Sequence, residues 1–127
     1  MSTAASALRA ASIIALVQYG AHAFLFLSKG PRGHELGYGL MVILSGAVEV
    51  VALWLLSTMA TGGDRRAMPL VGVFVTANVG HALLALVYFF PAPAVFDGAI
   101  AACLVTALVA ARRPRATDRT VRGLQRT

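Results

Sequence analysis

The chain has few charged side chains. Lys, Arg, Asp and Glu make up 13% of its 127 residues, and 58% of the residues are hydrophobic. A soluble domain carries roughly 25% charged residues. The shortage excludes an ordinary soluble fold and predicts one domain that lies almost wholly in a lipid bilayer.

Acidic residues are especially scarce, with five Asp and Glu against eleven Lys and Arg. Six of the basic residues follow residue 111, in a short tail. A basic segment beside apolar runs is typical of contact with an anionic membrane surface. Because no soluble fold is left to present these charges to DNA, we expect the lipid bilayer as the partner and no nucleic acid.

Cysteine is nearly absent as well. The single Cys103 lies in an apolar run, so an intrachain disulfide is excluded. The sequence also lacks a phosphate-binding loop, a nucleophile elbow, a CxxC pair and an EF-hand pattern. The soluble enzyme and binding classes that these motifs define are therefore not indicated.

Long apolar runs are what the chain does contain, at residues 7–28, 36–59, 69–90 and 94–111. About 20 apolar residues are enough to span a bilayer as a helix. Ala21-His22-Ala23 fits a signal-peptide cleavage pattern, but the first run continues beyond it. Pro91-Ala92-Pro93 predicts a tight turn between the last two runs. We therefore predict an all-α membrane protein, a four-transmembrane-helix bundle with up-down topology over residues 1–113, followed by a basic, disordered cytoplasmic tail at 114–127.

The distribution of positive charge predicts the orientation. With four spans, the N-terminus, the middle loop and the tail share one side and carry nine Lys and Arg, whereas the other side carries only Lys29 and Arg32. Positively charged loops stay in the cytoplasm. Both termini are therefore predicted to be cytoplasmic, in a multi-pass protein of a bacterial inner membrane.

Glu49 lies in the middle of the second run, at residues 36–59. An acid at mid-bilayer costs on the order of 3 kcal/mol on insertion scales, so we expect other helices to supply partners. Counting about 1.5 Å per residue along each helix places Gln18, His22, Asn78 and His81 at similar depth, from mid-membrane to the outer leaflet. We expect His22 and His81 as the first partners of Glu49, with Gln18, Asn78 and Tyr38 around them. Tyr88 shares a face with Asn78, and Asp97 is expected at the mouth of the same cavity.

Several readings of these residues stay open. A lone Gln or Asn in a membrane helix is often interhelical glue, and Tyr38 and Tyr88 fit interfacial anchors. Two histidines and a carboxylate can bind zinc or non-haem iron, and one histidine can bind haem. No HxxxH or ExxH spacing supports a metal site, so the cofactor is undetermined. Glu49 with either histidine could also act as an acid–base pair.

Small residues form two stripes at four-residue spacing: Gly72, Thr76 and Gly80, and Ala99, Cys103 and Ala107. Such stripes allow helices to approach closely in a membrane. They would join the third and fourth helices within one chain, or join two chains in a homo-oligomer.

The segment GYGLMVILSGAVEVVALWLL, with Gly46 and Glu49, resembles the DoxX-like proteins, which implies a four-helix inner-membrane protein linked to redox or sulfur-related partners. The stretch from Tyr38 to Ile43 and Ala77-Asn78-Val79-Gly80 are similar to segments of styrene oxide isomerases, small four-helix membrane enzymes that use haem as a Lewis acid. Arg32 stands where that family has its haem-ligating histidine.

These observations give three functional hypotheses. The first is a polytopic inner-membrane protein whose buried Glu/His/Asn site binds a small lipophilic molecule through Gln18, Tyr38, Asn78, Tyr88 and Asp97. The second is a membrane-embedded isomerase or cyclase acting on a lipophilic substrate such as an epoxide, by acid–base or haem Lewis-acid chemistry, with Glu49, His81 and His22 as catalytic residues. The third is a structural partner subunit. The sequence does not decide between an enzyme and a binding protein.

Overall fold

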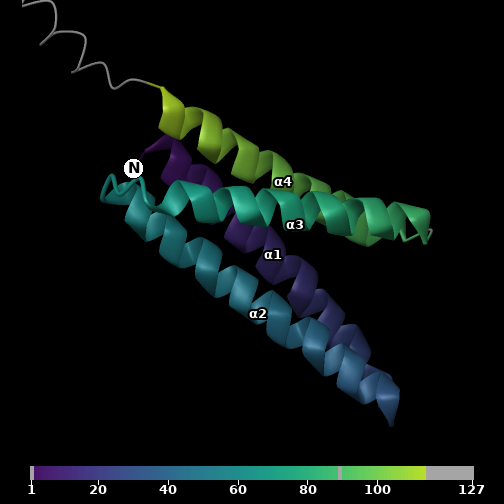
Figure 1. The fold of residues 1–127 in the computed structure, drawn as a ribbon. Coiled ribbons are helices and arrows are strands. Elements are labelled where there is room, and N and C mark those ends of the chain that lie inside the picture. Colours follow the sequence, from purple (N-terminus) through teal and green to yellow (C-terminus); the bar gives the residue numbers. More distant parts are fainter. Residues whose placement is uncertain (1, 89, 114–127) are drawn as a thin grey trace, which may run out of the picture.

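The computed structural model describes residues 2–88 and 90–113. It contains four α-helices in up-down order: α1 (Thr3–Ser28), α2 (His34–Thr61), α3 (Ala67–Val87) and α4 (Pro91–Arg112) (Figure 1). All four are long and apolar enough to cross a membrane. The predicted all-α, four-helix, multi-pass arrangement is confirmed, and the predicted disordered tail lies outside the described residues.

Local chemistry explains where the helices begin and end. The Ser2 hydroxyl caps α1 by accepting a hydrogen bond from the Ala5 N–H at 3.2 Å. Gly30 and Gly33, in the loop between α1 and α2, have φ of 61° and 60°, a left-handed conformation that glycine adopts without strain. The Asp64 side chain accepts from the Arg66 N–H at 2.9 Å just before α3.

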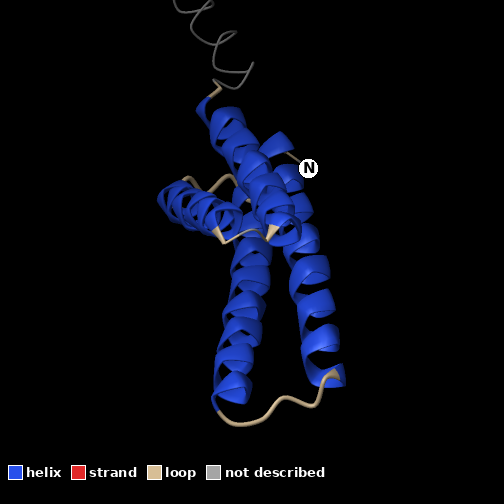
Figure 2. Cartoon of the chain, turned by 90° about the vertical axis from the view of Figure 1, so that its right-hand side faces the viewer, coloured by secondary structure: helices blue, strands red, loops and turns tan. Residues whose placement is uncertain are grey.

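The predicted tight turn at Pro91-Ala92-Pro93 is wrong. These residues form the first turn of α4, which begins at Pro91. The first N–H groups of a helix have no intrahelical partner, so proline costs little there and its fixed φ suits the helix. The chain instead reverses direction just before Pro91, between the end of α3 and the start of α4 (Figure 2).

The helices pack as two pairs, α1 with α2 and α3 with α4, and the pairs are joined by contacts between α1 and α4. By contrast, α2 and α3 touch only sparsely. The fully buried apolar side chains include Leu8, Leu53, Val71 and Leu104, and they lie toward the end of the molecule that holds the N-terminus and the 62–66 loop. Beyond this shared core the two pairs splay apart (Figures 1 and 2).

The two small-residue stripes have different surroundings. Ala107 is fully buried, and Cys103 packs against the core, so the α4 stripe lies inside the chain. A methyl group added at Gly72 or Gly80 would meet no neighbour within 4 Å. Of the two alternatives for the α3 stripe, packing against α4 within the chain is therefore not found, because α3 turns another face to α4.

Candidate functional site

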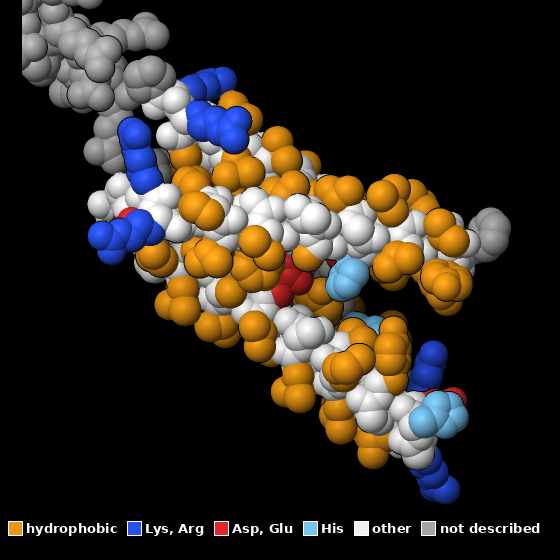
Figure 3. Space-filling model, in the orientation of Figure 1, with side chains coloured by type: hydrophobic (Ala, Val, Ile, Leu, Met, Phe, Trp, Pro, Cys, Tyr) orange, Lys and Arg blue, Asp and Glu red, His pale blue; other side chains and the backbone are white. Residues whose placement is uncertain are grey.

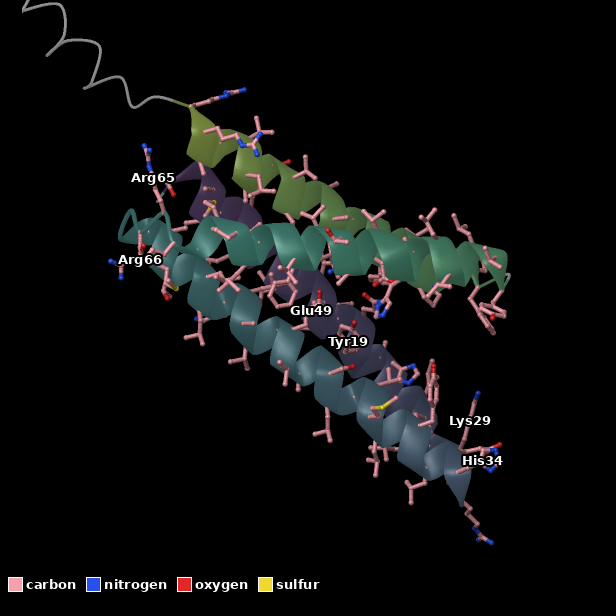
Figure 4. All side chains as sticks on the ribbon, in the orientation of Figure 1. Tyr19, Lys29, His34, Glu49, Arg65 and Arg66 are labelled. Carbon is pink, nitrogen blue, oxygen red and sulfur yellow. The ribbon has the colours of Figure 1, made fainter. Side chains whose placement is uncertain are left out.

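A notch separates the splayed ends of the two helix pairs, between the 29–33 end of α1 and α2 and the outer end of α3 and α4. The space-filling view shows acidic side chains at its inner end and a histidine beside them (Figure 3). Glu49 on α2 and Tyr19 on α1 lie in this region (Figure 4). The notch is open at the end of the molecule where the two pairs splay apart (Figures 1 and 3).

Glu49 is bound by neighbours from two other helices. Its side chain is 9% exposed. The Tyr19 hydroxyl donates a hydrogen bond to Oε2 at 3.0 Å, and Nδ2 of Asn78 donates to Oε1 at 2.6 Å. One donor for each oxygen is an arrangement that stabilises a carboxylate in a poorly hydrated setting. Both donors are neutral, so the acid is solvated by dipoles rather than by a cation.

A glycine on α2 allows Tyr19 to reach Glu49. The ring of Tyr19 lies directly against Gly46, where a Cβ would overlap the ring atoms. The ring of Phe26 likewise lies against Gly39, seven residues before Gly46 and nearer the 29–33 loop. Small residues at such contacts let membrane helices approach closely. Close approach of α1 and α2 thus aims the Tyr19 hydroxyl at the carboxyl group.

Asn78 is the most constrained polar side chain in the site. It is 2% exposed, and its Nδ2 donates both to Glu49 and to the Phe74 carbonyl, the latter at 3.0 Å. Two acceptors around one nitrogen fix the orientation of the amide, since only the NH₂ group donates. The other atom, Oδ1, is buried and has no hydrogen-bond partner. A buried carbonyl oxygen without a partner lowers the stability of the fold by about 1–3 kcal/mol. A hydrogen-bond donor at this atom would remove that cost.

Asp97, which is buried, and Gln18, which is half-buried, form a second pair beside the first. Asp97 is 3% exposed, and its Oδ1 accepts from Nε2 of Gln18 at 2.9 Å. The expectation that Asp97 lies at the mouth of the cavity is wrong, because the residue is held inside by α1. The Gln18 Oε1 is also buried without a partner. Asp97 interacts electrostatically with Glu49, so the two carboxyl groups belong to one polar network, formed by Gln18, Tyr19, Glu49, Asn78 and Asp97.

The histidines do not take the predicted positions as first partners of Glu49. His22 is exposed and stacks on Phe26, with ring centroids 6.2 Å apart. His81 is also exposed, although it is close enough to Asp97 to interact with it electrostatically. The two oxygens of Glu49 accept their described hydrogen bonds from Tyr19 and Asn78 instead.

Tyr38 and Tyr88 lie outside the polar network. Their side chains are 66% and 69% exposed, which suits contact with lipid or the interface. Within residues 2–88 and 90–113, no group of three or more His, Cys, Asp or Glu is arranged to hold a metal ion. Arg32, at the position of the haem ligand in styrene oxide isomerases, is exposed near the 29–33 end.

Tyr19 is the residue that the sequence analysis missed. An aromatic residue in the middle of an apolar helix is commonly a core or lipid-facing residue, so it carries no signal of its own. A signal was present in the spacing: Tyr19 and Phe26 are seven residues apart, as are Gly39 and Gly46 on the next helix. Large residues facing small ones at equal spacing are typical of antiparallel helix packing.

Two other hollows lie away from the polar network. A cavity of about 390 Å³ sits at the end of the bundle opposite the notch, lined by residues that include Ser2, Asp64, Arg65 and Arg113. An apolar groove of about 220 Å³ lies between α1 and α2, against Trp54. Neither contains a buried acid, so the polar network remains the best candidate site.

Comparison with known proteins finds no matching family model, no matching curated protein and no matching solved structure. The resemblances to DoxX-like proteins and to styrene oxide isomerases gain no support from these searches.

Proposed function

We propose that the polar network binds the polar end of a small lipophilic molecule whose apolar part lies in the notch. The observation that carries this proposal is the unpaired, buried Oδ1 of Asn78, next to the buried acid Glu49. A purely structural network would be expected to pair its buried atoms, because each unpaired one destabilises the fold. Here two amide oxygens are left over, at Asn78 and Gln18.

The position of the network supports entry from the membrane. Because α2 and α3 contact each other only sparsely, a molecule dissolved in lipid can reach Glu49 between them without crossing water. Exposed apolar side chains such as Tyr38, Met41 and Leu84 lie on these helices, and they would accompany an apolar tail. An intramembrane ionisable group is a functional candidate on general grounds.

Photolabelling tests this proposal. The protein is placed in lipid nanodiscs with a mixture of diazirine-bearing dodecyl probes that carry hydroxyl, amine or carboxylate heads. After irradiation, labelled residues are mapped by peptide mass spectrometry. We expect labelling concentrated on the notch faces of α2 and α3, and weakened in Asn78→Leu. Labelling spread evenly around the lipid-facing surface would refute a binding site.

A second candidate function is isomerisation or cyclisation of the bound molecule. The observation in its favour is that Asp97 is close enough to both the His81 imidazole and Glu49 to interact with them electrostatically, which supplies groups able to give and take a proton. The test is incubation of the protein with 1,2-epoxydodecane and analysis of products by gas chromatography. Isomerisation that disappears in Glu49→Gln supports an enzyme; no conversion above a protein-free control rejects this substrate class. The absorption spectrum of the purified protein, read for a Soret band, tests haem.

We also propose that both termini face the cytoplasm of a bacterial cell. Arg65 and Arg66 lie at the same end of the bundle as the N-terminus, and Lys29 lies at the opposite end (Figures 1 and 4). This arrangement supports the orientation, because the more basic end of a bundle stays in the cytoplasm. In a Cys103→Ser background, an impermeant maleimide should label Lys29→Cys in intact cells and Asp64→Cys only after lysis. The reverse pattern rejects the orientation.

We propose a second copy of the chain as a partner for the open α3 stripe. Gly72, Thr76 and Gly80 leave room for close approach of another helix. Cross-linking in the membrane should give dimers that Gly72→Leu abolishes, while Gly98→Leu, at another open glycine, leaves them unchanged. Equal dimer yields in the wild-type chain and in Gly72→Leu reject this surface.

A further inference from the structure

We infer that the molecule bound by the polar network has a primary ammonium head. This inference rests on the proposed binding function and adds the chemical class of the ligand. It follows from the hydrogen-bonding groups of the site, in which acceptors exceed donors. A positively charged group with several N–H donors can bind the unused acceptors.

The acceptors outnumber the donors. The buried amide oxygens of Asn78 and Gln18 have no donor at all. Each oxygen of Glu49 receives one hydrogen bond, and a carboxylate has lone pairs for about four. Oδ1 of Asp97 receives one hydrogen bond, from Gln18. The site therefore offers several unused acceptor positions, and they come from all four of the described helices.

The donors of the network are nearly exhausted. The Tyr19 hydroxyl has one hydrogen, and it is used on Glu49. Both hydrogens of the Asn78 amide are used, on Glu49 and on the Phe74 carbonyl. Only the Gln18 amide keeps one hydrogen beyond its bond to Asp97. A ligand that brought further acceptors would find almost nothing to bind.

Charge points the same way. Glu49 and Asp97 are both buried carboxyl groups, and the hydrogen-bond partners described for them are neutral: Tyr19, Asn78 and Gln18. The His81 imidazole interacts electrostatically with Asp97, but it is exposed and makes no hydrogen bond to either carboxyl group among the described residues. Opposite charges attract strongly where water is scarce. The site therefore favours a cationic head group, and an alkyl carboxylate or phosphate would be repelled by the two acids.

An ammonium ion fits these requirements better than other donor groups. It has three N–H donors and no acceptor, whereas a hydroxyl has one donor, and a quaternary ammonium has charge without donors. Its small size suits a site whose acceptors are nearly covered. To reach the two unpaired amide oxygens it has to enter between α2 and α3, the two neighbouring helices with the fewest mutual contacts.

Competition between head groups tests the inference. Photolabelling of the notch in nanodiscs is displaced with dodecylamine, dodecan-1-ol, dodecyltrimethylammonium or dodecanoate, which share one chain length. A hydrogen bond to a charged group contributes about 1.5–3 kcal/mol, so we expect dodecylamine to displace the probe at concentrations about tenfold or more below those of the other three. Equal potency of dodecylamine and dodecyltrimethylammonium would overturn the role of the N–H donors. Stronger displacement by dodecan-1-ol or dodecanoate would overturn the role of charge.

Variants assign the preference to the network. Glu49→Gln and Asp97→Asn keep the shape of each side chain but remove its charge, and each should reduce the advantage of dodecylamine by about tenfold. The control is Asp64→Asn, which removes a carboxyl group in the 62–66 loop. This variant should leave the advantage of dodecylamine over the other competitors unchanged. If the probe labels the notch without any preference for the amine, the ammonium inference fails while the binding function stands. If the probe never labels the notch, the binding function itself fails.

Discussion

Replacing Gly46 by alanine puts a methyl group where the ring of Tyr19 lies. The overlapping atoms are Cγ, Cδ1 and Cδ2 of the ring, which are close to the root of the side chain. They cannot move aside as the tip of a flexible chain would. Either α1 and α2 separate locally, or Tyr19 leaves its place and its hydroxyl loses Glu49.

The magnitude follows from these two effects. Overpacking of this kind costs about 1–3 kcal/mol. A hydrogen bond between membrane helices contributes about 0.6 kcal/mol on average and about 1.7 at most. We therefore expect Gly46→Ala to lower the free energy of unfolding by about 2–4 kcal/mol.

A matched control is available in the same helix. A Cβ at Gly37 would meet nothing within 4 Å, so Gly37→Ala should be neutral or stabilising by up to about 1 kcal/mol, the advantage of alanine over glycine in a helix. In a Tyr19→Ala background the ring is gone, and Gly46→Ala should then behave like Gly37→Ala. The difference between the two backgrounds isolates the contact between Tyr19 and Gly46.

Unfolding in mixed micelles, followed by circular dichroism during titration with dodecyl sulfate, measures these values. Each variant is first checked for helical content without denaturant. If Gly46→Ala proves as stable as Gly37→Ala, the Tyr19 ring does not lie on α2, and the path by which its hydroxyl reaches Glu49 is wrong.

Three further predictions use the same unfolding assay. Asn78→Leu should lower the free energy of unfolding by about 1–3 kcal/mol because it leaves one Glu49 oxygen without its donor. Adding Glu49→Leu to this variant should restore part of the lost stability. If the losses of the two single variants simply add in the double variant, the direct hydrogen bond is contradicted. Gly39→Ala should destabilise less than Gly46→Ala, since the added methyl group meets the tip of the Phe26 ring, which can move aside more easily than its root. A loss larger than that of Gly46→Ala would contradict this reasoning. His22→Ala should change the free energy of unfolding by no more than about 0.5 kcal/mol because the side chain is exposed. A larger loss would mean that His22 interacts with the polar network.

The four helices, and the relative positions of the polar residues along them, could be predicted from the sequence because each depends on one helix at a time. Apolar length determines which segments can span a membrane, and a constant rise per residue determines depth whatever the packing. Glu49 and Asn78 were expected near each other on this basis, and they are hydrogen-bonded. Depth is a property of each helix alone.

The divergence of the helix pairs could not be predicted in this way. It depends on how side chains of different helices interlock, which a single sequence read helix by helix does not reveal. For this reason depth alone predicts that His22 and His81 meet Glu49, whereas both are exposed and the acid is bound by Tyr19 and Asn78. The role of Tyr19 depends on the same packing, because the residue reaches the acid only over Gly46.

The two contacts of aromatic rings with glycines also bear on the order of assembly during synthesis. Both contacts, Tyr19 on Gly46 and Phe26 on Gly39, lie within the first two helices, and a slip by one residue would press both rings onto side chains at once. The α1–α2 hairpin can therefore find its register before α3 leaves the ribosome. Of the two donors to Glu49, the α1–α2 hairpin by itself contains Tyr19, whereas Asn78 comes only with α3.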